Sequence, residues 1–194
     1  ATLGIVGVGN VGKRVLRAAR SLGMQVLCND PPRERSEGEG EFVPLKRLLA
    51  GADIVTLHVP LNREGRDQTL AMADRDFLQA MKTGAWLINS SRGAVVEDEA
   101  LAEALGANRL GGAVLDVFNH EPTPDRRLLE RAAITTPHIA GYSTDGKANG
   151  TMMSVQAVSR FFGLGLDDWQ PEGLPGPEVN ILHLDGAATA WTGE

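Results

Sequence analysis

Short apolar runs alternate along this chain with segments of helical period, and this alternation restricts the possible folds more than any other feature. The runs occupy residues 3–8, 25–29, 53–58, 85–89, 112–116 and 133–136, and most are nearly continuous valine, isoleucine, leucine and alanine. Strands buried on both faces of a parallel sheet have this composition. Helices are expected between them, at residues 11–22, 45–50, 74–81, 97–105, 125–131 and 145–162. The pattern predicts an α/β fold with a doubly wound parallel sheet and helices on both faces.

The first helix and the two polar stretches complete this outline. One apolar stripe along the helix predicts which side chains are buried, namely Val11, Val15, Ala18, Ala19 and Leu22, and Gly23 is expected to end the helix. Residues 31–40 are charged and contain two prolines, so we expect a surface loop there. Residues 166–178 are rich in proline and glycine and predict a linker.

The linker divides the chain into expected domains. Residues 1–165 would form the sheet domain, and a strand at 179–184 would begin a C-terminal dimerisation domain that is cut short within residues 179–194. The first strand starts at residue 3 with no cap or linker before it. We therefore expect an N-terminal portion to be missing.

Composition argues against several classes of partner. The 194 residues carry a formal net charge of −6, which disfavours nucleic acids and anionic membrane surfaces. No apolar stretch approaches the ~18 residues that a membrane helix needs. Cys28 is the single cysteine, and the four histidines have no metal-ligand spacing. We expect a cytoplasmic protein with no metal site, no nucleic-acid partner and no membrane partner.

A glycine-rich loop follows the first predicted strand and opens the first helix. Residues 7–12 read Gly-Val-Gly-Asn-Val-Gly, which fits the pattern G-x-G-x-x-G. Gly7, Gly9 and Gly12 would give a tight turn, close approach of the backbone to a pyrophosphate, and close packing of helix on strand. The N-terminus of the helix then offers unpaired N–H groups to phosphate oxygens. In this context the loop predicts a dinucleotide site.

An acid at the end of the second strand indicates which dinucleotide is bound. Asp30 lies 21 residues after Gly9, where a carboxylate accepts hydrogen bonds from the ribose hydroxyls of the adenosine and repels a 2′-phosphate. NAD is therefore expected rather than NADP. Arg33 and Arg35 lie nearby and could receive that phosphate, although ordinary solvated charges are the simpler interpretation.

Three polar side chains follow the later strands, and all should reach the carboxyl edge of the sheet, where ligands bind. Arg92 comes after the fourth strand, Glu121 after the fifth and His138 after the sixth. A histidine suits proton transfer at neutral pH, and a carboxylate paired to its second nitrogen stabilises the imidazolium. An arginine grips a substrate carboxylate with two hydrogen bonds. The three residues together predict oxidation of a 2-hydroxy acid, although each residue alone could have an ordinary structural role.

These motifs resemble those of the D-isomer-specific 2-hydroxyacid dehydrogenases. The matching segments are residues 7–12, 89–93, 116–122 and 137–141, and the resemblance extends over residues 3–184. Within the family, residues 30–32, 57–74 and 138–151 are most similar to the branch that oxidises 4-phospho-D-erythronate in pyridoxal 5′-phosphate biosynthesis.

The resemblance implies a Rossmann fold, NAD as the cofactor, a phosphorylated hydroxy acid as the substrate, and a homodimer at full length. It implies catalytic roles for Arg92, Glu121 and His138, with His138 as the proton donor and acceptor. Cofactor contacts are implied for Gly7, Gly9, Asn10, Val11, Gly12, Asp30, Val59, Pro60, Asp116 and Gly141, and substrate contacts for Arg92 and Tyr142. Val59 replaces a usual hydroxyl residue, so its contact would use the backbone.

Two alternatives share the same motifs. The first is another family member, of the phosphoglycerate, glycerate or lactate type, which would carry the same three catalytic residues. The second is an NAD-sensing module of the corepressor type, which would not be an enzyme. The family also places a substrate domain before the glycine loop, so we expect this chain alone to bind NAD with little turnover.

Overall fold

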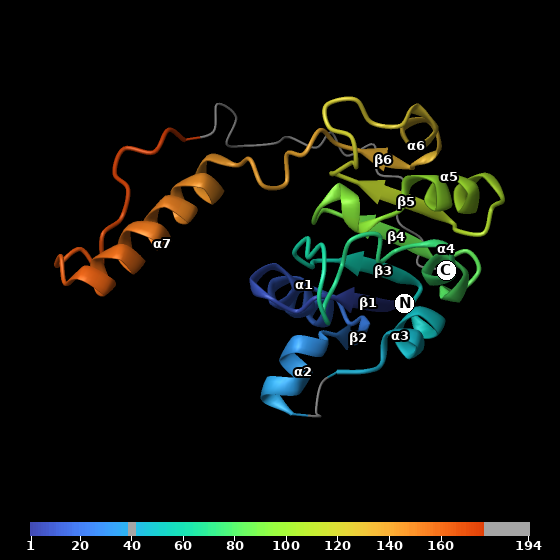
Figure 1. Ribbon diagram of the computed structural model, residues 1–194, viewed down its shortest axis with the longest axis horizontal. Coiled ribbons are helices and arrows are strands. Elements are labelled where there is room, and N and C mark those ends of the chain that lie inside the picture. Colours follow the sequence, from blue (N-terminus) through green and yellow to red (C-terminus); the bar gives the residue numbers. More distant parts are fainter. Residues whose placement is uncertain (39–41, 177–194) are drawn as a thin grey trace. The chain divides into compact units, whose positions relative to one another are not determined.

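The computed structural model describes residues 1–38 and 42–176, and the chain divides into two compact units, Ala1–Ala140 and Gly141–Glu194. The first unit contains a six-stranded sheet whose strands are all parallel (Figure 1). The strands are β1 (Thr2–Val6), β2 (Gln25–Asn29), β3 (Ile54–Leu57), β4 (Trp86–Asn89), β5 (Gly112–Leu115) and β6 (Ile134–Thr135). They lie in the order β2-β1-β3-β4-β5-β6, which confirms the predicted fold class.

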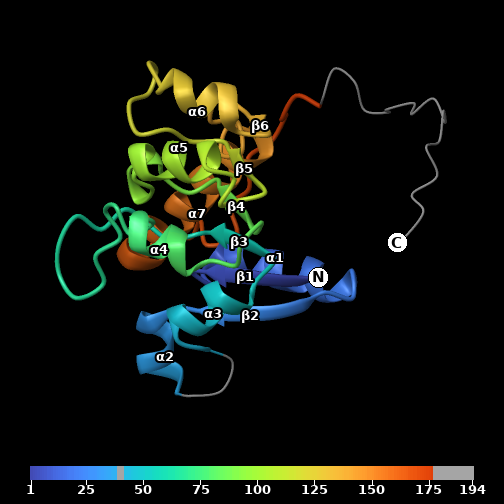
Figure 2. The same ribbon diagram turned by 90° about the vertical axis from the view of Figure 1, so that its right-hand side faces the viewer.

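Helices pack on both faces of this sheet (Figure 2). Leu16 of α1 (Asn10–Ser21) joins Leu3 and Ile5 of β1 in one apolar cluster. Val6 of β1 points to the opposite face and belongs to a larger cluster. The helices that contribute to that larger cluster are α3 (Leu45–Gly51), α4 (Arg75–Ala80), α5 (Asp98–Gly106) and α6 (Arg126–Arg131).

The expectation of a loop at residues 31–40 is wrong for most of that stretch. A short helix, α2 (Pro31–Glu37), follows β2 directly. The side chain of Asp30 caps it by accepting a hydrogen bond from the backbone N–H of Arg33. Pro31 fits the first turn because its φ is already helical, and Arg33 forms an ion pair with Glu37 one turn later. The cap and the ion pair offset the low apolar content that favoured a loop.

The predicted stripe on α1 is only partly correct. Ala19 is buried and Val15 is partly buried. Ala18 is exposed, however, and Val11 and Leu22 are 58% and 78% exposed. The helix instead buries Gly12 and Leu16, because the tight contact of Gly12 with the glycine loop sets its rotation. The predicted end is confirmed: Gly23 has a φ of 72° and donates to the carbonyl of Arg20, as in a Schellman motif.

The second unit contains one long helix, α7 (Thr144–Phe162), which begins at a Ser143 cap and ends at Gly163 with a φ of 65°. In the part of the chain that the structure describes, no helix is long and apolar enough to cross a membrane. The strand expected at residues 179–184, with the start of a dimerisation domain, lies outside the described residues. The domain boundary at residue 165 and the linker at 166–178 stay predictions.

Candidate active site

The glycine loop joins β1 to α1 with the geometry expected of a nucleotide site. A methyl group on Gly12 would lie 2.2 Å from the carbonyl oxygen of Gly7, and one on Gly7 would lie 2.6 Å from the carbonyl oxygen of His58. Both positions therefore require glycine. Gly9 differs, because a methyl group there would meet nothing within 4 Å. Its surface is open for the approach of a ligand to the backbone.

The N-terminus of α1 has the electrostatic character that a pyrophosphate requires. Gly9 is the N-cap residue and, as a glycine, has no side chain that could cap this helix, whose first turn contains no acid. The N–H groups of the first turn, which includes Asn10 and Val11, and the positive end of the helix dipole together favour an anion.

A pocket of about 560 Å³ opens beside this loop and reaches the end of β2. Five of the residues for which the resemblance implies cofactor contacts line it, namely Gly7, Gly9, Asp30, Val59 and Pro60. Asp30 accepts hydrogen bonds from the backbone N–H groups of Val8 (2.8 Å) and Arg33 (3.1 Å). Each carboxylate oxygen has a second lone pair, so Asp30 retains acceptor capacity for ribose hydroxyls. The open glycine, the helix terminus and this carboxylate fit NAD.

His58 also lines this pocket, a position that the sequence did not single out. Its Nε2 atom lies 3.0 Å from the hydroxyl of Thr56, which is buried. Burial lowers the pKa of His58, because an imidazolium is poorly solvated there. The ring is therefore held in its neutral form at neutral pH.

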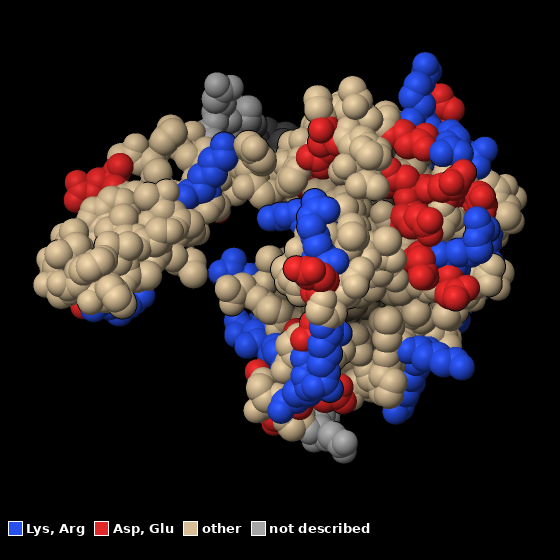
Figure 3. Space-filling view, viewed as in Figure 1, with Lys and Arg blue, Asp and Glu red and all other residues tan. Residues whose placement is uncertain are grey.

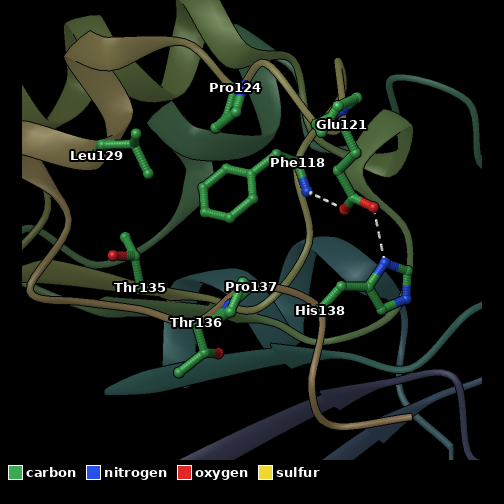
Figure 4. Close-up of a pocket in the computed structure, with 9 residues that line it drawn as sticks. Phe118, Glu121, Pro124, Leu129, Thr135, Thr136, Pro137 and His138 are labelled. Carbon is green, nitrogen blue, oxygen red and sulfur yellow. Dashed lines mark hydrogen bonds and ion pairs between the residues drawn. The ribbon is translucent and has the colours of Figure 1, made fainter. Parts of the chain in front are cut away.

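The second predicted feature, the histidine–carboxylate pair, is present in the structure (Figure 4). Nδ1 of His138 lies 2.8 Å from Oε2 of Glu121, and the other carboxylate oxygen accepts a 2.9 Å hydrogen bond from the backbone N–H of Phe118. The two side chains are 34% and 37% exposed. The pair is accessible to solvent and to a ligand.

The environment of Glu121 keeps it ionised. Partial burial pushes its pKa upward, but the hydrogen bonds from His138 and from the N–H of Phe118 outweigh burial and leave the pKa below its ordinary value. An ionised carboxylate on Nδ1 fixes the orientation of the imidazole and stabilises its protonated form.

Asp116 holds the turn that carries the histidine. Its buried carboxylate accepts hydrogen bonds from the hydroxyl of Thr136 (2.6 Å) and from the N–H groups of Ile139 (2.9 Å) and Ala140 (3.0 Å). His138 has a φ of 56°, in the left-handed region that a non-glycine residue rarely adopts. Such strain persists only where surrounding contacts impose it, and it is commonest at functional sites. The sequence marked Asp116 as a cofactor contact and did not identify this positioning role.

Arg92 lies on the loop after β4. Hydrogen bonds of the Asn89 side chain hold this loop in shape. The Asn89 side chain accepts from the N–H and hydroxyl of Ser91 and donates to the carbonyl of Arg92. The next residue, Gly93, lies so close to the loop after β5 that a methyl group on it would be 1.9 Å from the carbonyl oxygen of Phe118. That second loop also carries Glu121. The segments that bear the arginine and the glutamate are therefore packed together.

The side chain of Arg92 is available for a ligand. It donates to the carbonyl of Ser91 at 2.6 Å, and within residues 1–38 and 42–176 it makes no ion pair. Its exposed guanidinium keeps further donors for an anion. Gly141 and Tyr142 belong to the second unit, where the Tyr142 ring contacts Lys147 (4.2 Å from Nζ to the ring centroid). Their roles stay predictions.

A smaller pocket of about 330 Å³ lies against the histidine–carboxylate pair (Figure 4). Its walls are mainly apolar and include Phe118, Pro124 and Leu129, with Glu121 and His138 at one side. An apolar wall beside a hydrogen-bonded pair lowers the local dielectric constant and strengthens the interaction between the two groups.

Comparison with known proteins agrees with these features. The profile of the D-isomer specific 2-hydroxyacid dehydrogenase NAD binding domain matches residues 1–140. An erythronate-4-phosphate dehydrogenase of Bacteroides fragilis is 53% identical over 166 residues, which are 86% of this chain and 48% of that protein. One from Pseudomonas aeruginosa is 45% identical over 195 residues, 98% of this chain and 50% of that protein. The chain thus spans about half the length of these curated relatives.

Solved structures of dehydrogenases and reductases are also similar to this chain. A D-lactate dehydrogenase from Aquifex aeolicus, complexed with NAD and lactic acid, is 31% identical with a TM-score of 0.68 over 87% of this chain and 55% of that one. A glyoxylate reductase from a Paecilomyces species is 30% identical with a TM-score of 0.69 over 81% of this chain and 48% of that one. The chain belongs to the D-isomer specific 2-hydroxyacid dehydrogenase family and contains its NAD-binding domain.

Proposed function

We propose that this chain is the NAD-binding half of an enzyme that oxidises 4-phospho-D-erythronate to its 2-oxo acid in pyridoxal 5′-phosphate biosynthesis. The observation that carries the proposal is the 2.8 Å contact between His138 and Glu121, at the sheet edge that also bears the glycine loop. The names of the relatives at 45–53% identity support the choice of substrate.

The reaction separates the hydroxyl hydrogen from the hydrogen on C2. Nε2 of His138 would take the proton of the C2 hydroxyl, and Glu121 would stabilise the resulting imidazolium through Nδ1. Arg92 would hold the substrate carboxylate with two hydrogen bonds and keep C2 in position. NAD supplies the acceptor for the hydride that leaves C2.

This chain's own residues would hold the cofactor along the same edge. Gly7, Gly9, Asn10, Val11 and Gly12 would surround the pyrophosphate, and Asp30 would accept from the adenosine ribose. Val59 and Pro60 would contact the cofactor from the loop after β3. A contact of Asp116 with the nicotinamide half is implied by the family resemblance. The contacts proposed for Gly141 and Tyr142 rest on the family resemblance alone.

Two other functions use the same site. A phosphoglycerate, glycerate or lactate dehydrogenase would need the same trio, and an NAD-sensing module would need only the nucleotide pocket. The 53% identity with an erythronate-4-phosphate dehydrogenase favours the proposed substrate over the first. The His138–Glu121 pair favours an enzyme over the second. A homodimer and a cytoplasmic location stay predictions from the sequence.

The test is a substrate panel on the protein isolated from its source, in whatever length the cell makes it. The panel contains 4-phospho-D-erythronate, 3-phosphoglycerate, glycerate and lactate, each with NAD, and follows the absorbance of reduced nicotinamide. We expect the highest kcat/KM with 4-phospho-D-erythronate. A higher value with another acid would reassign the substrate, and the absence of turnover with every acid would favour the sensing module.

A further inference from the structure

The nucleotide pocket contains a charged pair that the proposed reaction does not use. Arg35 of α2 donates a hydrogen bond and forms an ion pair with the carboxylate of Asp67. Asp67 lies on the loop between β3 and α4, 32 residues further along the chain. Both residues line the pocket that also contains Asp30 and Gly9, and their side chains are 35% and 31% exposed. The pair is therefore part of the wall that a bound adenosine would face.

The backbone around Asp67 is fixed by contacts that do not involve its side chain. The side-chain amide of Asn62 donates to the carbonyl of Asp67 at 3.0 Å, and the backbone N–H of Asn62 donates to the hydroxyl of Thr69 at 2.8 Å. That hydroxyl in turn donates to the carbonyl of Pro60. The backbone that carries the carboxylate is thus held in place, and a change of Asp67 to asparagine leaves these contacts intact.

Few N–H groups or positively charged side chains near Asp30 are available to bind a 2′-phosphate. Pro31 and Pro32 have no N–H group, and the N–H of Arg33 is bonded to Asp30. The guanidinium of Arg33 donates to the carbonyl of Val8 and to Glu37, and the side chain does not line the pocket. Among the described residues that line it, the lysine and arginine side chains are those of Arg35 and Arg66 alone.

We propose that Asp67 is a second determinant of the preference for NAD over NADP, because it neutralises Arg35. The inference rests on the proposed placement of the adenosine ribose at Asp30. A phosphate on the 2′ oxygen would lie beside Asp30, in the pocket that Arg35 also lines, so Arg35 is a potential partner for it. Asp67 occupies that partner and adds a second negative charge to the one on Asp30. NADP would have to displace an existing ion pair, whereas NAD would not.

The experiment measures the affinity of the chain for NAD and for NADP by calorimetry. The variants are Asp67→Asn, the double variant Asp67→Asn with Arg35→Ala, and Asp67→Asn with Arg66→Ala. Glu103→Gln is the matched control. Glu103 of α5 forms an ion pair with Arg75 of α4, and neither residue lines the pocket, so this change also removes one carboxylate from an ion pair. Figure 3 shows charges of both signs interspersed over this part of the first unit.

We expect Asp67→Asn to bind NADP about tenfold more tightly, as one charge-assisted hydrogen bond would give, with NAD affinity changed by about twofold at most. The gain should disappear when Arg35→Ala is added and survive when Arg66→Ala is added. Glu103→Gln should change neither affinity.

Two results would overturn the inference alone: normal NAD binding with no NADP gain in Asp67→Asn, or a gain that depends on Arg66 and not on Arg35. Asp30→Ala binding NAD as tightly as wild type would instead overturn the placement of the ribose, and the inference with it.

Discussion

The backbone N–H of His138 donates a 2.8 Å hydrogen bond to the carbonyl oxygen of Asp116. The carboxylate of the same aspartate accepts from Ile139 and Ala140, so one residue at the end of β5 fixes both sides of the histidine. His138 keeps its positive φ because these contacts impose it. We therefore expect Asp116 to act on the proposed reaction through the position of the imidazole.

The first prediction concerns this positioning. Asp116→Ala should lower kcat by about 100-fold in a preparation with turnover, because a small misplacement of a reacting group has a cost of this size. Thr136→Val removes only the 2.6 Å hydroxyl contact and should have a smaller effect. Kinetics and thermal unfolding are measured together. A loss of kcat that is matched by a general loss of stability in both variants would contradict a positioning role.

The second prediction concerns proton transfer. His138→Ala should lower kcat by ~10²–10⁴-fold with NAD affinity nearly unchanged. Glu121→Gln should move the acid limb of the pH–kcat profile to lower pH, because the ionised carboxylate favours the protonated imidazole. The measurement is the pH dependence of kcat for wild type and Glu121→Gln. An identical profile would remove Glu121 from the mechanism.

The third prediction separates two glycines of the same loop. Gly12→Ala should destabilise the fold, because its methyl group would lie 2.2 Å from the carbonyl oxygen of Gly7. Gly9→Ala should leave the unfolding temperature nearly unchanged but weaken NAD binding, because the methyl group fills space left for the pyrophosphate. Gly150→Ala, which also meets no neighbour within 4 Å and lies on α7, controls for the added methyl group. Full NAD affinity in Gly9→Ala would show that the pyrophosphate lies elsewhere.

The fourth prediction follows from the lowered pKa of His58. Between the usual value of 6.5 and the lower folded value, the unfolded chain binds more protons than the folded chain at this residue. The stability contribution of His58 is therefore present above pH 6.5 and is lost as the pH falls through the folded pKa. The loss is at most about 1.4 kcal/mol per pH unit. Denaturant unfolding of wild type and His58→Gln at several pH values measures it. The variant should lose less stability on acidification, and parallel curves would contradict the account.

The parts of the site that depend on local pattern could be predicted from the sequence. The glycine loop is encoded in six consecutive residues, and Glu121 and His138 each follow a strand that ends at the same edge. Helix α2 could not be predicted from apolar period, because its formation depends on the Asp30 cap and on an ion pair. The Arg35–Asp67 pair and the hydrogen bonds from residues 139 and 140 to Asp116 join distant segments. Only the folded chain reveals such contacts.

The measurement that tests the central claim most directly is a calorimetric titration of this chain with NAD, with wild type and Asp30→Ala side by side. We propose that the adenosine ribose lies at Asp30, in the pocket of about 560 Å³ beside the glycine loop. We therefore expect saturable binding of one NAD per chain, tighter than that of NADP. Asp30→Ala should bind NAD clearly more weakly and show a smaller preference for NAD over NADP. An absence of NAD binding, or equal NAD affinity of the two proteins, would contradict this placement.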